Sequence, residues 1–490
     1  MYRHRGWAGA IFAAVLILPL LAPAGMHAQE NDVVVRVDPR VELLSIVFRL
    51  AGNPEYGQGR VPAYNAAIDE HFAPSGAHPT VELARQLREE RGISFDAVMG
   101  MAIHLEDAFA PELAFPVEET DAWLYGDGRW TPAAAASFVT ALNEFVADTD
   151  FRAFWESQAT LYAAAERSAR YLAAEELRAG WFADFFGRSP EAPFTMIPGL
   201  ANGGANYGNR FRDARGREHA YAIIGVGAVD EAGLPVLRAG QLPTVIHEFN
   251  HSFVNPTTEP YREEFAEASH VYTVMEDVMR RQAYAGWHTV VNESLVRAAV
   301  VRYLRANDGN ERAESELERQ VDRGFLWIRE LDALFGEYES DRDRWPTFAS
   351  FMPRIVGHFE ALAGRVDGMA AEREAAVEAE QRALDPLRPE LVSVEPADGS
   401  RDVDPETSAI VLRFDRPMSG AYQLNPAEGW GFPETTGLSW NEDQTVLTLE
   451  VRLEPDADYA LVLNRPTGGA FRSADEDIPL RMTTVRFRTR

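Results

Sequence analysis

Two histidines with a glutamate between them form a candidate metal site near the middle of the chain, in the run His247-Glu248-Phe249-Asn250-His251. Residues four apart lie on the same face of a helix, so the imidazoles of His247 and His251 could hold one metal ion. The carboxylate of Glu248 could then accept a proton from a water molecule on that metal. The types and spacing of these residues therefore predict a zinc site with its own general base.

The residues on either side of this run predict the helix that the site requires. Pro243 suits the first turn of a helix, where a missing N–H costs nothing. The pair Asn255-Pro256 predicts the end of that helix, because proline disfavours helical backbone in the residue before it. A helix that carries two histidines by chance is the alternative interpretation, and the helical context favours the metal site.

A third ligand is expected, because a catalytic zinc site has three protein ligands and leaves one position for water. The longer pattern HExxHxxGxxH is not met, since Val254 and Thr257 take the places of its glycine and third histidine. Glu293 is the favoured ligand because it lies early in a predicted apolar helix, although the helix dipole alone could favour a glutamate there. The other candidates follow the motif at shorter spacing: Glu263, Glu264, Glu267, His270 and Glu276.

Composition and charge restrict where the protein works and what it binds. The 490-residue chain has no cysteine, which excludes thiolate zinc sites and disulfides. Residues 1–28 combine Arg3 and Arg5 with an apolar run and a final small residue, Ala28. This pattern predicts a signal peptide and an exported protein, secreted or periplasmic. No later stretch is long enough to insert into a membrane, and a net charge of −29 disfavours nucleic acid as a partner.

Changes of pattern along the chain predict two domains of an α+β fold class. Residues 29–384 are expected to be mostly helical, with strands at 194–197 and 219–229 and an irregular Gly/Asn-rich loop between these strands. Residues 385–390 predict a linker, because their two prolines cannot continue a helix. Residues 391–490 alternate between apolar and polar in short runs, which predicts an all-β sandwich.

The metal motif, with Asn292-Glu293 on a second predicted helix, resembles the gluzincin clan of thermolysin-like zinc peptidases. More narrowly, residues 37–384 are similar to an uncharacterised family of secreted bacterial proteins, a domain of unknown function that is expected to be a zincin-like metallopeptidase. Three features carry this likeness: the run at 49–56, the loop that ends in Asn-Tyr-Gly at 206–208, and the extended motif at 247–256.

The resemblance implies roles for four residues. His247, His251 and Glu293 would bind Zn²⁺, and Glu248 would be the general base in the hydrolysis of a peptide or protein substrate. This chain departs from the thermolysin-like pattern in one respect. Those enzymes carry an aspartate shortly after the ligand glutamate, and that aspartate supports a histidine. Arg297 lies one helical turn after Glu293 here, so different groups must support the ligands.

Peptide hydrolysis also requires a donor that stabilises the oxyanion of the tetrahedral intermediate. Tyr303 and His358 are the candidates that we assign to catalysis, with His288 and Tyr207 as alternatives. In related enzymes a strand just before the metal helix binds the substrate backbone. Residues 219–229 or the loop at 202–206 could serve that purpose.

The C-terminal runs at 394–399 and 410–418 resemble the Ig-like domain of bacterial surface-layer and secreted proteins. Such a domain would be a spacer or a contact to a cell surface or polymer, since fold alone does not decide function. The expected function is therefore that of a secreted zinc metallopeptidase. The alternative is a surface- or polymer-binding protein whose zinc site is structural or inactive, and the presence of Glu248 favours the enzyme.

Overall fold

A computed structural model describes residues 33–124, 128–188, 191–213, 215–464 and 469–490. The predicted signal peptide at 1–28 lies outside these residues. The chain divides into two compact units, of which the first runs to Val366 and the second is Asp367–Arg490. This division falls at the start of helix α17 (Val366–Leu384), ahead of the linker predicted at 385–390. Apart from Val366, α17 has no buried residue, so its side chains are exposed or half-buried along the whole helix.

The first unit is mainly helical, and several of its helices carry proline in the first turn, as predicted at Pro243. Those between the first and second strands of the sheet are α1 (Pro39–Leu50), α2 (Pro62–Phe72), α3 (Pro79–Arg91), α4 (Asp96–Ile103), α5 (Thr120–Trp123), α6 (Pro132–Asp148), α7 (Phe151–Ser157), α8 (Ala159–Tyr171) and α9 (Gly180–Phe186). Those after it are α10 (Leu242–Thr258), α11 (Arg262–Ala266), α12 (His270–Arg280), α13 (Trp287–Asn307), α14 (Asn310–Asp322), α15 (Ile328–Ser340) and α16 (Phe348–Ala363).

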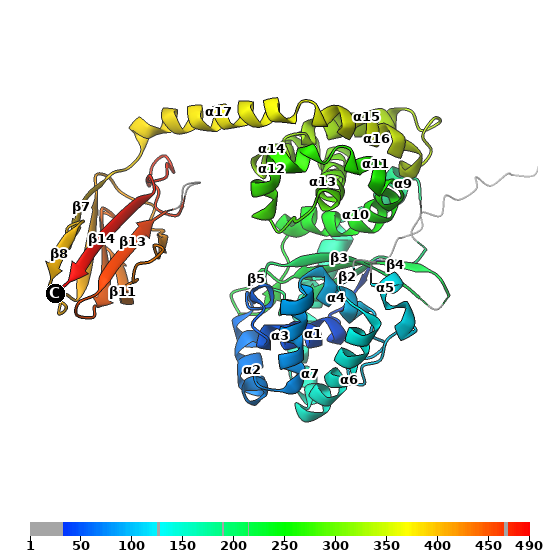
Figure 1. Cartoon of the computed structure of the whole chain (residues 1–490), viewed down its shortest axis with the longest axis horizontal. Coiled ribbons are helices and arrows are strands. Elements are labelled where there is room, and N and C mark those ends of the chain that lie inside the picture. Colours follow the sequence, from blue (N-terminus) through cyan, green and yellow to red (C-terminus); the bar gives the residue numbers. More distant parts are fainter. Residues whose placement is uncertain (1–32, 125–127, 189–190, 214, 465–468) are drawn as a thin grey trace, which may run out of the picture. The chain divides into compact units, whose positions relative to one another are not determined.

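A four-stranded sheet separates the later helices from most of the earlier ones (Figure 1). Its order is β1-β2-β4-β3, from β1 (Val34–Val35), β2 (Thr195–Gly199), β4 (Glu218–Gly225) and β3 (Asn206–Arg212). β2 and β4 are parallel, whereas β3 runs antiparallel to β4 and forms one edge of the sheet. A small hairpin, β5 (Ala228–Val229) with β6 (Pro235–Val236), follows before α10.

The strand expectations for this unit are only partly met. β2 agrees with the strand predicted at 194–197, and β4 covers most of 219–229. β4 is bonded on both sides, by β2 and by β3, so it has no free edge on which a substrate could pair. The free edge belongs to β3, which begins inside the stretch that we expected to be irregular.

Two side chains of α1 hold the loop that leads into β3. The carboxylate of Glu42 accepts a hydrogen bond of 2.7 Å from the backbone N–H of Leu200, and burial raises the pKa of this carboxyl to about 7. The hydroxyl of Ser45 donates to the side-chain oxygen of Asn202 at 2.8 Å. Both partners on α1 are buried, so the loop is fixed from beneath by the core of the unit.

Gly208 brings the edge strand into close contact with α10. A Cβ at this position would lie 2.2 Å from the carbonyl oxygen of Glu248 and 3.0 Å from Cβ of His251. Neither a helix carbonyl nor a Cβ can rotate away, so only glycine allows β3 to approach the helix this closely. Glycine in this stretch led us to expect a loop, but at position 208 glycine is required for the strand to lie against α10.

Replacing Gly208 by alanine is expected to destabilise the first unit by about 1–3 kcal/mol, because the added methyl group must push β3 away from α10. Urea denaturation followed by circular dichroism measures the change. Gly204→Ala is the matched control, since it lies just before the same strand and its added methyl group would have no atom within 4 Å. Equal stability of the two variants would contradict the close contact.

The second unit is a β-sandwich, as predicted, and gives the protein its α+β class together with the first unit. One sheet has the order β10-β13-β14-β8 and the other β11-β12-β9-β7. Apolar side chains from both sheets share one core. The strands are β7 (Leu391–Glu395), β8 (Ser400–Val403), β9 (Ala409–Phe414), β10 (Leu424–Asn425), β11 (Glu434–Trp440), β12 (Val446–Arg452), β13 (Asp458–Leu463) and β14 (Thr483–Thr489).

Among the described residues, no helix combines the length and the apolar composition needed to cross a bilayer.

Candidate metal centre

Helix α10 presents both histidines on one face, as their spacing predicts. The helix runs past Asn255-Pro256 to Thr258, so the predicted stop is wrong by about one turn. A proline this near the end of a helix removes a single backbone hydrogen bond, and the chain continues at once into a 3₁₀ turn at Glu259–Tyr261.

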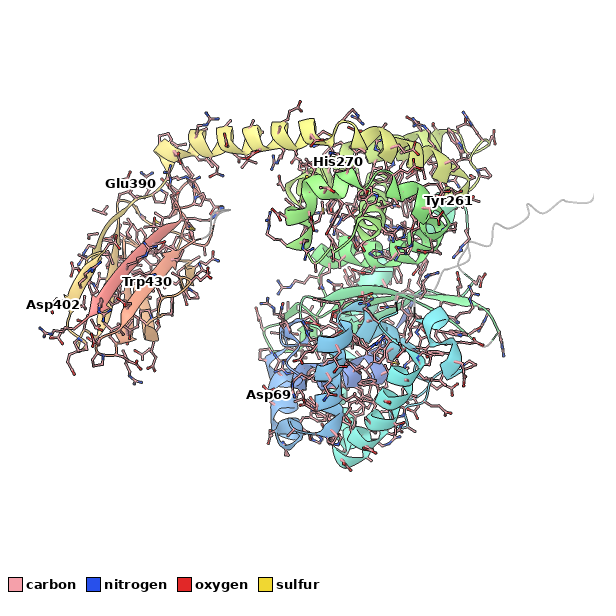
Figure 2. The ribbon with its side chains drawn as sticks, in the orientation of Figure 1. Asp69, Tyr261, His270, Glu390, Asp402 and Trp430 are labelled. Atoms are coloured by element: carbon pink, nitrogen blue, oxygen red, sulfur yellow. The ribbon has the colours of Figure 1, made fainter. Side chains whose placement is uncertain are left out.

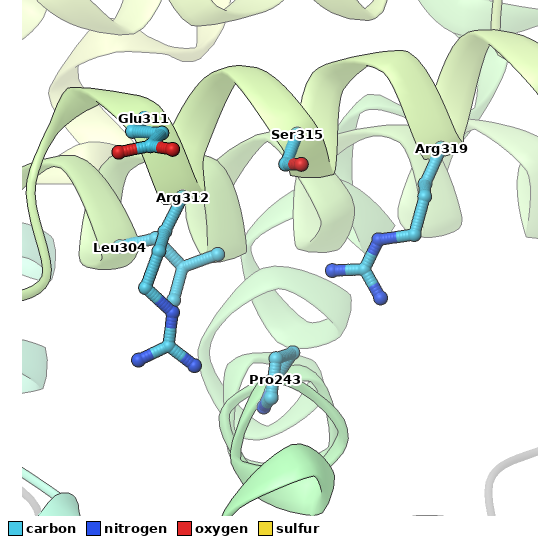
Figure 3. Close-up of a pocket in the computed structure, with 6 residues that line it drawn as sticks. All are labelled: Pro243, Leu304, Glu311, Arg312, Ser315 and Arg319. Atoms are coloured by element: carbon cyan, nitrogen blue, oxygen red, sulfur yellow. The ribbon is translucent and has the colours of Figure 1, made fainter.

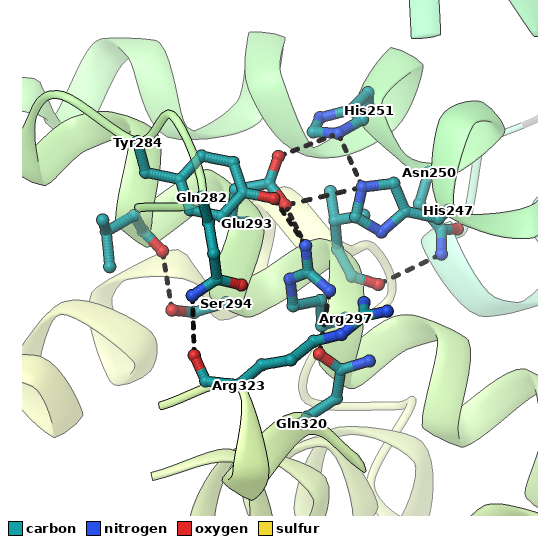
Figure 4. Close-up of polar contacts among 12 residues, drawn as sticks. His247, Asn250, His251, Gln282, Tyr284, Glu293, Ser294, Arg297, Gln320 and Arg323 are labelled. Carbon is teal, nitrogen blue, oxygen red and sulfur yellow. Dashed lines mark hydrogen bonds and ion pairs between the residues drawn. The ribbon is translucent and has the colours of Figure 1, made fainter. Parts of the chain in front are cut away.

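Glu293 on α13 meets both histidines, because α10 and α13 pack against each other. Nε2 of His247 and Nε2 of His251 are 3.2 Å apart (Figure 4). One carboxylate oxygen of Glu293 lies 3.5 Å from Nε2 of His247, and the other lies 3.3 Å from Nε2 of His251. In tetrahedral zinc sites with bonds of about 2.0–2.1 Å, donor atoms are about 3.3 Å apart. The three donors therefore fit a zinc ion.

The carboxylate of Glu248 lies at the same place from another side. Its ligand atom and those of the two histidines all lie within 4.8 Å of one another. Two carboxylates thus border the site, and that of Glu293 is the one that contacts both imidazoles. This arrangement leaves Glu248 as a second, slightly more distant group, the position that a general base would occupy.

The remaining third-ligand candidates point elsewhere. Glu263, Glu264 and Glu267 are exposed at α11, and His270 is exposed at the start of α12 (Figure 2). Glu276 pairs with Arg280 on its own helix. Glu293, by contrast, is buried, as its apolar neighbours in the sequence indicate.

Burial acts on the pKa of each of the four ionisable groups at the centre, and the charges of neighbouring groups either oppose or reinforce that effect. Burial raises the pKa of Glu248 to about 7 and lowers that of His247 well below its usual value. Burial alone would lower the pKa of His251, but Glu293 outweighs it and raises this pKa to about 9. Burial likewise opposes ionisation of Glu293, yet His247 and Arg297 hold its pKa well below the usual range. The charge of each group at the centre therefore depends on burial and on the charges of its neighbours.

Asn255 orients one of the ligands. Its side-chain oxygen lies 3.1 Å from Nδ1 of His251. An amide oxygen only accepts, so Nδ1 carries a proton, and in the neutral imidazole that a metal would bind the lone pair of Nε2 points toward Glu293 and His247. The sequence marked Asn255 as a helix end and did not indicate this role.

Arg297 supports Glu293 from behind. The sequence predicted that the groups supporting the ligands would differ from those of thermolysin-like enzymes, because Arg297 follows Glu293 at one helical turn. Its guanidinium donates to Glu293 at 2.9 Å, to the hydroxyl of Tyr284 at 2.6 Å and to the side-chain oxygen of Gln320 at 2.8 Å. Arg297 is itself buried, so these acceptors compensate a charge that is removed from water. Tyr284 and Gln320 come from separate segments, and no sequence spacing connects them with the motif.

The two residues assigned to catalysis as oxyanion donors do not reach the histidines. Tyr303 lies ten residues beyond Glu293 on α13, about 15 Å along the helix axis. Its hydroxyl accepts a hydrogen bond of 2.6 Å from the backbone N–H of Arg178, and its ring packs against Trp181. His358, on α16, lies beside Glu330, with 3.8 Å between Nε2 and the carboxylate.

The two alternative donors, His288 and Tyr207, differ in their surroundings. His288 lies 3.3 Å from the carboxylate of Glu259. Tyr207 neighbours Gly208 on β3, and successive side chains of a strand point to opposite faces. Since Gly208 faces α10, the side chain of Tyr207 leaves the opposite face of β3, toward Tyr56, although, besides burial, the charge of Glu248 still contributes to the raised pKa of its hydroxyl. Sequence spacing alone therefore did not identify the donor.

Comparisons with known proteins give a family but no activity. The family model described as Domain of unknown function (DUF4932) matches residues 33–358. No curated protein matches the chain. Two solved structures of the bacterial S-layer protein SbsC, its N-terminal part and rSbsC(31-844), each cover 51% of the chain, at 10% and 11% identity. The matches span 58% and 36% of those chains, and both TM-scores are 0.16, too low to carry an argument about fold.

Proposed function

The chain belongs to the DUF4932 family, and we propose that it is an exported zinc metallopeptidase. The observation that carries this proposal is the meeting of His247, His251 and Glu293 beside the carboxylate of Glu248: the two Nε2 atoms are 3.2 Å apart, and the two oxygens of Glu293 lie 3.5 Å from Nε2 of His247 and 3.3 Å from Nε2 of His251. A structural zinc site is closed by four protein ligands. Three ligands next to a free carboxylate favour a hydrolytic site.

His247, His251 and Glu293 would hold zinc, which when bound supplies a Lewis acid for a carbonyl group and for water. Glu248 takes the proton from the attacking water and delivers it to the nitrogen of the leaving amine. Asn255 keeps Nε2 of His251 free to act as a ligand, and Arg297 fixes both the position and the charge of Glu293.

The free edge of β3 supports an extended peptide as the substrate. This strand lies next to α10 because Gly208 allows the close approach, and its outer edge has no partner strand among the described residues. A peptide could pair with that edge through backbone hydrogen bonds, which bring its amide groups past the metal helix whatever its side chains are. Strand pairing thus supplies affinity without deciding sequence preference.

Export is part of the proposal. It is supported by the charged and apolar pattern of residues 1–28, which lie outside the described residues.

The proposal is tested with the purified protein by measuring zinc content and cleavage of a peptide library. We expect about one zinc per chain, cleavage that stops when a chelator removes the metal, and recovery when zinc is returned. Bound zinc with no cleavage of any peptide would favour the alternative, a surface- or polymer-binding protein with a structural or inactive site. Cleavage that a chelator does not affect would contradict the metal site.

A further inference from the structure

Arg323 lies next to the candidate metal centre on a fixed piece of backbone. It follows the last residue of α14, and its carbonyl oxygen accepts a hydrogen bond of 2.7 Å from the side chain of Gln282. Figure 4 shows its side chain extended beside the cluster of Glu293 and Arg297. Its charge also acts on His247, whose pKa it helps to lower. The guanidinium is therefore close enough to the centre for its charge to matter there.

The guanidinium of Arg323 has no hydrogen-bond or ion-pair partner in the part of the chain that the structure describes. Partial burial lowers the pKa of Arg323, and the positive charge of Arg297 lowers it further. The environment thus opposes this cation, and nearby Glu316 offsets the effect only in part. The side chain is nevertheless exposed, so a bound anion can reach it, and the charge of that anion would offset the repulsion from Arg297.

A cleft lined in part by the helix that precedes Arg323 has room for part of a substrate (Figure 3). Its volume is about 340 Å³, which is within the usual range for ligand sites. The cleft lies between α10 and α14, and its lining residues are Pro243, Leu304, Glu311, Arg312, Ser315 and Arg319. Pro243 is one helical turn from His247, and Arg319 is one turn from Arg323, so each of these two cleft walls continues along its helix toward His247 or Arg323.

The other arginines of the cleft are already paired. Arg312 lies 2.8 Å from the carboxylate of Asp308, and Arg319 pairs with Glu316 on the same helix. Glu311 adds a negative charge to the cleft wall. Arg312 and Arg319 are therefore neutralised by carboxylates of the protein, whereas the charge of Arg323 remains available to a ligand.

We propose that Arg323 binds a carboxylate of the peptide substrate, so that the site selects peptides with an acidic group next to the cleft. This inference rests on the proposed function, since it identifies the substrate of the same centre. The planar guanidinium can donate two parallel hydrogen bonds to a carboxylate, which gives orientation as well as affinity. The carboxylate is that of an aspartate or glutamate side chain or that of the peptide C-terminus.

Binding to zinc-loaded Glu248→Gln protein tests the inference without turnover. The probes are alanine-based hexapeptides that carry either Glu or Gln at one central position, each with a free or an amidated C-terminus. We expect peptides with the favoured carboxylate to bind at least about tenfold more tightly than the fully neutral peptide. The Glu/Gln comparison and the acid/amide comparison show separately which carboxylate is bound.

Adding Arg323→Gln should remove this preference and leave both the affinity for the neutral peptide and the zinc content unchanged. Arg323→Lys, which keeps the charge without the planar fork, should keep part of it. Arg85→Gln on α3, an identical change of charge at a surface position, is the control and should keep all of it. Equal binding of all peptides, or a preference that survives Arg323→Gln, would overturn the inference.

The proposed function and the inference fail in different ways. If the protein with Glu248 intact cleaves acidic and neutral peptides equally well and binds them equally, the inference is wrong and the peptidase stands. If binding is selective through Arg323 but no peptide is cleaved under any condition, the carboxylate site stands and the peptidase is wrong.

Discussion

Replacing Glu248 by glutamine is expected to lower kcat/KM for peptide cleavage by about 10²–10⁴-fold while zinc content stays unchanged. The amide is nearly the same size as the carboxylate but cannot take a proton from water. His247, His251 and Glu293 keep their contacts with one another in this variant, because none of those contacts passes through Glu248. Kinetic assays with a library-derived peptide and metal analysis of the same sample measure both quantities.

The control for this variant is Glu267→Gln, the same chemical change at an exposed position beside α11. It should leave cleavage and zinc content at the wild-type level. If Glu248→Gln kept most of its activity, Glu248 would not be the base, and the metal centre would need another proton acceptor. If it lost zinc as well, Glu248 would be a ligand, and the division of roles between the two carboxylates would be wrong.

Helix α10 could be predicted because the signals for it are local. The four-residue spacing of His247 and His251 and the proline at the first turn both act within α10 itself. Glu293 could be predicted as well, since a carboxylate among apolar residues must have a partner once it is buried. The strands of the second unit could be predicted because apolar and polar residues alternate along them, and this alternation matches the buried and more exposed positions of β9 and β12.

The features that could not be predicted depend on contacts between distant segments. β3 has a composition typical of a loop, and only its contact with α10 explains why Gly208 must be a glycine. Tyr303 was chosen by its sequence distance from Glu293, which on a straight helix places the two about 15 Å apart. The hydrogen-bond partners of Arg297 come from α14 and from the segment before α13, which meet only in the fold. The repulsion between Arg297 and Arg323 depends on the same contact between α13 and α14.

Replacing Glu293 by alanine is expected to abolish zinc binding and also to destabilise the metal-free protein by about 3–5 kcal/mol. The second effect arises because Arg297 would remain buried after losing the carboxylate that it bonds at 2.9 Å. Stability is measured by urea denaturation with a chelator present for every variant, so that loss of bound zinc does not contribute. Zinc affinity is measured separately by competition with a chelator.

The double variant Glu293→Ala/Arg297→Met separates the two roles of Glu293. Removing both charges should recover most of the lost stability, because no buried ion is left without a partner. Zinc binding should not recover, because two imidazoles alone do not complete the site. Arg297→Met by itself keeps all three donor side chains and should still bind zinc. Wild-type zinc affinity in the double variant would show that Glu293 is not a ligand and acts only as the partner of Arg297.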